Sequence, residues 1–97
     1  MIQSFGDDAT ADLFHGANSK AARRIPKALW PTVKRKLDML DTVTRLDALR
    51  IPPSNHLEAL KGDRAGSYSI RVNKQYRITF RFKGEHCYDV RCEDYHD

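Results

Sequence analysis

The sequence predicts an α+β fold, with helices in the first half and an antiparallel sheet in the second. Two observations support this: apolar residues recur every three or four positions up to residue 40, and from residue 67 they alternate with polar ones. A sheet with one apolar face needs a cover, which the helices can provide. With 97 residues, the chain has room for a single domain over residues 1–97, and we expect the order β-α-α-β-β-β.

The first predicted elements are a short edge strand over residues 2–5 and a helix after it. Asp7 or Asp8 is expected to cap this helix, because a short carboxylate accepts the amide protons that a first turn leaves unpaired. The helix should end near Gly16 and Asn18, which are weak helix formers.

The second helix is amphipathic. Its apolar stripe consists of Ile25, Leu29, Val33, Leu37 and Leu40. Proline is tolerated only in a first turn, so the regular helix should begin nearer Pro31 than Pro26 and end between residues 41 and 44. A short turn over residues 46–49 and an extended link at residues 52–53 are expected to follow.

The second half predicts three strands joined by short links. The strands are expected over residues 68–72, 76–82 and 86–92, with links over 73–75 and 83–85. Links this short imply antiparallel hairpins. With three residues in each link, Ile70 pairs with Ile78 and Ile78 pairs with Val90.

The same register predicts a row of like charges on the polar face. It places Arg71 opposite Arg77, and Arg77 opposite Arg91. Like charges directly opposed on a sheet are unfavourable, so a bound anion would supply the missing counter-charge. The alternative is that nearby carboxylates neutralise the row; they are Asp63, Asp89 and Glu93.

Basic residues are concentrated in two stretches. The formal net charge is +4 and the pI is about 9.3. Residues 19–37 contain no acidic residue, and residues 61–83 contain only Asp63. A nucleic acid would suit such a distribution, although a solvated charged surface explains it as well.

Several classes of protein are excluded at this stage. No apolar run is long enough for a membrane helix, and the first residues do not resemble a signal peptide. Cys87 and Cys92 lack metal-ligand spacing and would face opposite ways on a regular strand, which suggests free thiols in a reducing cytoplasm. We therefore expect neither a metal nor another cofactor, and we interpret His15, His56 and His86 as structural or solvent-facing.

Four segments together resemble the HigB toxins of the RelE/ParE superfamily. They are Leu60-Lys61-Gly62-Asp63-Arg64, Tyr68-Ser69-Ile70-Arg71-Val72-Asn73, Tyr76-Arg77-Ile78-Thr79-Phe80 and Glu93-Asp94-Tyr95-His96. The resemblance implies a RelE-like fold, in which two helices pack on a small curved antiparallel sheet. It also implies cleavage of mRNA in the ribosomal A site without a metal.

The resemblance further implies the residues of the site. The catalytic positions of the family fall on Lys61, Arg77, Asp94, Tyr95 and His96. The basic residues expected to bind RNA phosphates are Arg64, Arg71, Lys74 and Arg91. Some relatives carry a histidine three residues before the lysine, where this chain has Glu58, so the general base stays open.

These residue types suit RNA cleavage by the 2′-hydroxyl of the RNA itself. A planar guanidinium can bind two phosphate oxygens, and a tyrosine ring can stack on a base. Imidazole and carboxylate groups can transfer protons. The expected partners are a HigA-like helix-turn-helix antitoxin, the ribosome with its mRNA, and operator DNA through the antitoxin complex, without a membrane partner.

Two other functions stay open. A ParE-like gyrase poison would act by protein contact, and it would not need the proton-transfer groups at residues 94–96. A non-catalytic regulator would only bind the antitoxin or a nucleic acid.

Overall fold

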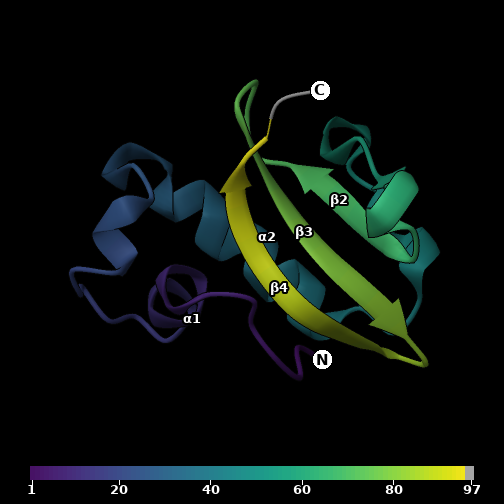
Figure 1. The fold of residues 1–97 in the computed structure, drawn as a ribbon, viewed down its shortest axis with the longest axis horizontal. Coiled ribbons are helices and arrows are strands. Elements are labelled where there is room, and N and C mark those ends of the chain that lie inside the picture. Colours follow the sequence, from purple (N-terminus) through teal and green to yellow (C-terminus); the bar gives the residue numbers. More distant parts are fainter. Residues whose placement is uncertain (96–97) are drawn as a thin grey trace.

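The computed structural model describes residues 1–95 and confirms the α+β class. Its elements are α1 (Asp8–Phe14), α2 (Trp30–Thr42), β1 (Glu58–Ala59), β2 (Ser67–Arg71), β3 (Tyr76–Lys83) and β4 (His86–Asp94). The four strands form one antiparallel sheet in the order β1-β2-β3-β4. The long strands curve, and α2 crosses behind them (Figure 1).

Helix α2 supplies the cover that the sheet requires. Pro31 lies in its first turn, where proline is tolerated, as the sequence predicted. The buried side chains of α2 and of the sheet form one core, whose fully buried members include Val33, Leu37, Leu40, Ile70, Ile78, Phe80 and Val90. The opposite face of the sheet is left for polar side chains.

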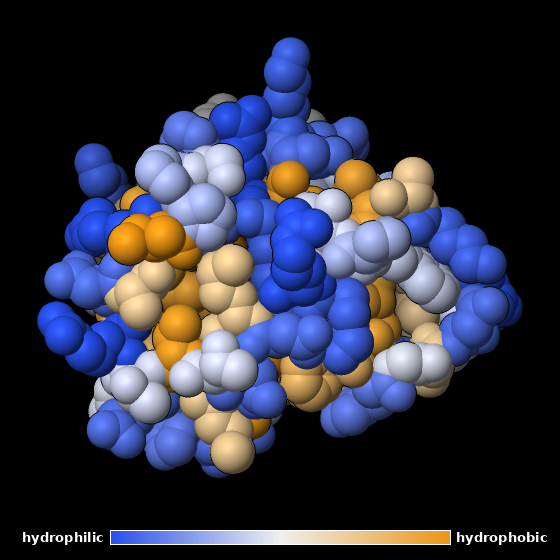
Figure 2. All heavy atoms as spheres, turned by 180° about the vertical axis from the view of Figure 1, so that it is seen from behind, coloured by the Kyte–Doolittle hydropathy of each residue, from blue (hydrophilic) through white to orange (hydrophobic). Residues whose placement is uncertain are grey.

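The surface on the α2 side is mixed in character. Figure 2 shows hydrophilic residues over much of this face, with hydrophobic residues gathered between them. Within residues 1–95, no helix has both the length and the apolar composition to cross a membrane.

Both edges of the sheet differ from the prediction. Residues 2–5 form two isolated parallel bridges to β4, Ile2 with Cys87 and Phe5 with Val90, in place of a continuous strand. At the opposite edge, the two-residue strand β1 was not predicted, because two residues are too few to show a period. It pairs Glu58 with Ser69.

The predicted pairing of β2 with β3 is correct, but that of β3 with β4 is wrong. Ile70 pairs with Ile78, and Arg71 pairs with Arg77. The second turn pairs Lys83 with His86, and a β-bulge between Thr79 and Arg81 shifts the register again. As a result, Ile78 lies opposite Cys92 rather than Val90.

The bulge also corrects the prediction for the charged row and for the two thiols. Arg77 lies opposite Glu93, not Arg91, so a carboxylate sits where a like charge was expected. Asp89 adopts a left-handed backbone with φ of 54°, which adds a residue to β4. Cys87 and Cys92 are therefore both buried in the same core, whereas a regular strand would turn them to opposite faces.

The amino end of α1 permits a test of helix capping. Asp7 is the N-cap residue, and its Oδ1 accepts a hydrogen bond from the Thr10 backbone amide at 2.9 Å. We expect Asp7→Ala to lower the free energy of unfolding by about 1 kcal/mol, as measured by urea denaturation. Asp7→Asn, which retains a capping oxygen, should stay close to wild type. Equal losses in both variants would show that the charge matters and the cap does not.

Candidate functional site

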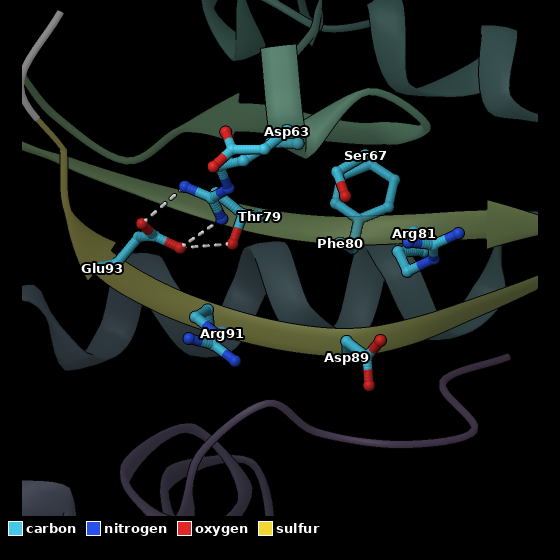
Figure 3. Close-up of a pocket in the computed structure, with 9 residues that line it drawn as sticks. Asp63, Ser67, Thr79, Phe80, Arg81, Asp89, Arg91 and Glu93 are labelled. Atoms are coloured by element: carbon cyan, nitrogen blue, oxygen red, sulfur yellow. Dashed lines mark hydrogen bonds and ion pairs between the residues drawn. The ribbon is translucent and has the colours of Figure 1, made fainter. Parts of the chain in front are cut away.

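The polar face of the sheet carries a cluster that joins three elements. The Arg64 guanidinium donates two hydrogen bonds to Glu93, to Oε1 at 3.0 Å and to Oε2 at 2.9 Å. The Thr79 hydroxyl donates to the same Oε2 at 2.6 Å. Figure 3 shows Glu93 and Thr79 from adjacent strands on the face away from α2. The cluster ties the turn after β1 to the middle of the sheet.

The cavity around this cluster has nearly balanced charges. It measures about 350 Å³, and its charged lining residues are Arg64, Arg81, Arg91, Asp63, Asp89 and Glu93. Arg91 also donates to the Gly6 carbonyl oxygen at 3.2 Å, which fixes it over the amino-terminal segment. Because the carboxylates equal the guanidinium groups in number, this cavity is a weak site for an anion.

Glu93 permits a test of the cluster through pH. Partial burial works against its ionisation, but hydrogen bonds from Arg64 and Thr79 outweigh this, so the pKa of Glu93 is lowered. The pKa of Arg64 is raised, first by its hydrogen bond to Glu93. A lowered carboxyl pKa stabilises the fold above the unfolded pKa of about 4.3, and the gain disappears as pH falls through the folded value.

We therefore expect Glu93→Gln to lose about 1 kcal/mol of unfolding free energy at pH 7, since the ion pair is only partly buried. The difference from wild type should shrink between about pH 5 and pH 3. Thermal unfolding followed by circular dichroism measures the loss at pH 7 and its change with pH. Glu85→Gln, in an exposed turn, is the matched control. A difference between Glu93→Gln and wild type that is the same at pH 7 and at pH 3 would contradict the ionic role of Glu93.

A second, smaller cavity gathers cationic and aromatic side chains at the other end of the same face. Its volume is about 200 Å³. It is lined by His56, Glu58, Arg71, Asn73, Lys74, Arg77 and Tyr95. Two strand cations, Arg71 and Arg77, and Lys74 from the link between β2 and β3 therefore meet one carboxylate here, so the cavity favours an anion.

Arg77 is the centre of this cavity. Its side chain is 11% exposed. Nε donates to the Ser69 hydroxyl at 2.8 Å, and Nη2 donates to the His56 carbonyl oxygen. Nη1 lies 3.8 Å from Glu58 Oε1, which is too long for a hydrogen bond. The guanidinium is thus fixed in orientation while its Nη1 edge can bind an oxygen of a ligand.

Tyr95 closes one side of the cavity. Its ring centre lies 5.9 Å from the Arg77 guanidinium carbon, a cation–π distance. Its backbone amide donates to the Gln75 carbonyl oxygen at 2.8 Å, which continues the pairing of β4 with β3. The ring is therefore held beside the guanidinium.

The structure brings together four of the predicted site residues. Arg71, Lys74, Arg77 and Tyr95 all line the smaller cavity.

The other predicted residues lie elsewhere or outside the described range. Lys61 is exposed at the start of a 3₁₀ turn and is not among the residues that line the smaller cavity. Asp94 lies just outside that cavity, where its Oδ2 accepts a hydrogen bond from Gln75. Arg64 and Arg91 belong to the larger cavity. His96 falls outside the described residues.

Three residues of the cavity were not predicted as part of the site: Glu58, His56 and Asn73. Glu58 enters because β1 pairs with Ser69, directly beside the contacts of Arg77. His56 was interpreted as structural or solvent-facing. It lines the cavity and adopts a left-handed backbone with φ of 44°, and its carbonyl oxygen accepts a hydrogen bond from Arg77. Only the position of Glu58, three residues before Lys61, gave a signal in the sequence.

The arrangement can bind a phosphate and accept a proton. The guanidinium suits phosphate oxygens, and the Glu58 carboxylate beside it is exposed enough to exchange protons with a ligand. Among residues 1–95, no group of three or more His, Cys, Asp or Glu side chains is placed to hold a metal ion.

The chain is similar to HigB proteins along its whole length. Residues 3–96 match the family described as RelE-like toxin of type II toxin-antitoxin system HigB. The Endoribonuclease HigB of Proteus vulgaris is 33% identical over 96 residues, which cover 99% of this chain and 100% of that protein. Toxin HigB-1 of Vibrio cholerae is 45% identical over 65 residues, covering 67% of this chain and 68% of that protein.

A relative from Haemophilus influenzae and a solved structure extend the comparison. The H. influenzae protein is 45% identical over 60 residues, which span 62% of this chain and only 59% of that relative's length. The YoeB–YefM complex of Staphylococcus aureus has the same fold, with a TM-score of 0.61, 16% identity, and coverage of 100% of this chain and 99% of the other. Because the family match extends over residues 3–96, the chain belongs to the RelE-like HigB toxins of type II toxin–antitoxin systems.

Proposed function

We propose that this protein is an endoribonuclease that cleaves mRNA on the ribosome and so inhibits translation. One observation carries the proposal: a nearly buried guanidinium, oriented by Ser69 and His56, faces a carboxylate and a tyrosine ring in one small cavity. These groups can supply a proton acceptor and can stabilise the negative charge that develops during phosphodiester cleavage. The name of the P. vulgaris relative supports the same activity.

In the proposed reaction, the 2′-hydroxyl of the RNA attacks the neighbouring phosphorus. Glu58 accepts the proton of that hydroxyl, and Arg77 stabilises the negative charge that develops on the phosphate oxygens. The bond from phosphorus to the 5′ oxygen breaks, which leaves a 2′,3′-cyclic phosphate. Tyr95 is placed to stack on a base beside the reacting phosphate.

The leaving 5′ oxygen must receive a proton. The family resemblance offers His96, Asp94 and Lys61 for this step. We assign Arg71 and Lys74 to phosphates of the same strand, since both line the cavity. Arg64 and Arg91 would contact RNA only at the margin of the site, because Arg64 already donates hydrogen bonds to Glu93 and Arg91 donates one to the Gly6 carbonyl oxygen.

The partners follow from the same proposal. The toxin would act in the cytoplasm, at the ribosomal A site, where translated mRNA is accessible. A HigA-like antitoxin with a helix-turn-helix domain would bind the toxin, and the complex would bind operator DNA. The YoeB–YefM complex supports a protein partner, because in it a toxin with the fold of this chain is bound to another protein.

A purified translation reaction tests the proposal. A defined mRNA is incubated with the toxin, with and without ribosomes, and the products are mapped by primer extension. Cleavage that requires ribosomes is the expected result. Intact mRNA in both reactions, together with inhibited DNA supercoiling by gyrase, would favour the ParE-like alternative instead. Intact mRNA without any effect on gyrase would favour a non-catalytic regulator.

A further inference from the structure

A second cationic groove adjoins the Arg77 cavity on the side of α2. Its volume is about 480 Å³. Four cations and two hydroxyl groups line it: Arg35, Lys36, Arg71, Lys74, Thr32 and Ser54. Among the described residues that line the groove there is no carboxylate, in contrast to the balanced cavity around Glu93.

The groove and the Arg77 cavity share one wall. Arg71 and Lys74 line both, as do His56 and Asn73. Arg71 is held between them, because its Nε donates to the Asn73 carbonyl oxygen at 3.1 Å. A ligand that enters the cavity at Arg77 can therefore continue into the groove without leaving a cationic surface.

Lys36 lines the groove but not the Arg77 cavity, and its environment is unusual for a lysine. The residue is only 5% exposed, and its Nζ donates to Asn55 Oδ1. Within residues 1–95, no carboxylate oxygen lies within ion-pair distance of this ammonium group. Burial lowers the pKa of Lys36, and the charge of Arg35 lowers it further.

Asn55 holds the ammonium group in place. Asn55 is fully buried, and its Nδ2 donates to the Leu49 carbonyl oxygen at 3.0 Å, which directs Oδ1 toward Lys36. A buried cation with one neutral acceptor costs free energy unless an anion compensates it. An anion in the groove would do so.

We propose that this groove binds a second phosphodiester of the RNA strand, the one next to the phosphate held by Arg77. The proposal rests on the function proposed above. The Arg35 guanidinium and the Lys36 ammonium would contact phosphate oxygens, with Thr32 and Ser54 as hydroxyl donors. Ribosomal RNA carries the same phosphodiester chemistry, so the test must separate the two sources.

Binding of an uncleavable RNA tests the groove separately from catalysis. The probe is a fluorescent, fully 2′-O-methylated RNA hexamer, which lacks the attacking hydroxyl. Fluorescence anisotropy gives its affinity over a series of KCl concentrations. We expect Arg35→Gln to weaken binding about three- to tenfold, and to reduce the slope of log K against log salt by about 0.7, the value for one phosphate contact on a single strand.

The matched control removes the same charge elsewhere. Arg23→Gln changes an exposed arginine in the 3₁₀ turn Ala22–Arg24, which packs near α1. It should leave the affinity and the salt slope nearly unchanged. Arg35 is exposed, so its replacement does not endanger folding, and a circular dichroism melt verifies this.

Three other outcomes would decide against the proposal or separate it from the nuclease assignment. Equal losses in Arg35→Gln and Arg23→Gln would overturn it, since net charge alone would explain them. Weaker binding of Arg35→Gln to mRNA-free ribosomes, with unchanged hexamer binding, would overturn it in favour of ribosomal RNA. Weaker hexamer binding, with a wild-type protein that leaves translated mRNA intact, would support the groove and overturn only the nuclease function.

Discussion

Arg77→Lys is expected to lower the rate of ribosome-dependent mRNA cleavage by about 10²–10³-fold, the usual effect of losing one donor to a developing oxyanion. Lysine keeps the charge but loses the planar guanidinium. Arg77 uses Nε and Nη2 to hold its position against Ser69 and His56, which leaves Nη1 for the phosphate. A single ammonium group cannot do both tasks.

The measurement is single-turnover cleavage of a defined mRNA on stalled ribosomes. Arg81→Lys is the matched control: it lies on the same strand, is exposed and lines the other cavity. It should change the rate by no more than about twofold, as expected for an exposed surface position. A wild-type rate for Arg77→Lys would remove Arg77 from the transition state and reduce its role to general charge.

Glu58→Gln is expected to lower the same rate by about 10²–10⁴-fold, the range that a general base contributes. Glutamine has nearly the same size and still accepts hydrogen bonds, but it cannot take up the proton of the 2′-hydroxyl. The Glu58 side chain is half exposed, so stability should change by less than about 0.5 kcal/mol. Affinity for the uncleavable hexamer should not fall, because a negative charge is removed.

The combination of a lost rate and a retained affinity is what identifies a base. Glu85→Gln, the same change in an exposed turn, should behave as wild type in both assays. If Glu58→Gln cleaves normally, the proton goes to another group and Glu58 only balances the charge of Arg77. The nuclease assignment would survive that result.

The spacing of apolar residues along the sequence predicted the main helices and strands, but it did not predict the full pairing of the strands. A strict alternation over residues 86–92 favours a regular strand, and only the left-handed Asp89 reveals the bulge that turns both thiols inward. Aspartate tolerates this backbone better than most residues, but it is also common elsewhere, so it gives no clear signal. The turn and the bulge each shift the pairing by one residue in the same direction, and a total shift of two residues keeps the apolar faces of β3 and β4 together.

The site was predictable where strand residues carry it. Arg71 and Arg77 share a face through the correctly predicted pairing of β2 with β3. Glu58 and His56 reach the cavity from a short edge strand and a left-handed loop residue, neither of which has a period. Their positions follow from tertiary contacts, above all the hydrogen bond from Arg77 to the His56 carbonyl oxygen.

The two inward-facing thiols can report on opening of the protein core. Burial raises the pKa of Cys87 to about 11 and that of Cys92 to about 12. Since the thiolate is the reactive form, both groups resist alkylating reagents at neutral pH while the sheet is closed. Their rate of modification therefore reports how readily β4 separates from α1 and α2. The proposed binding of an antitoxin or of RNA should lower this rate, which can be measured without an added label.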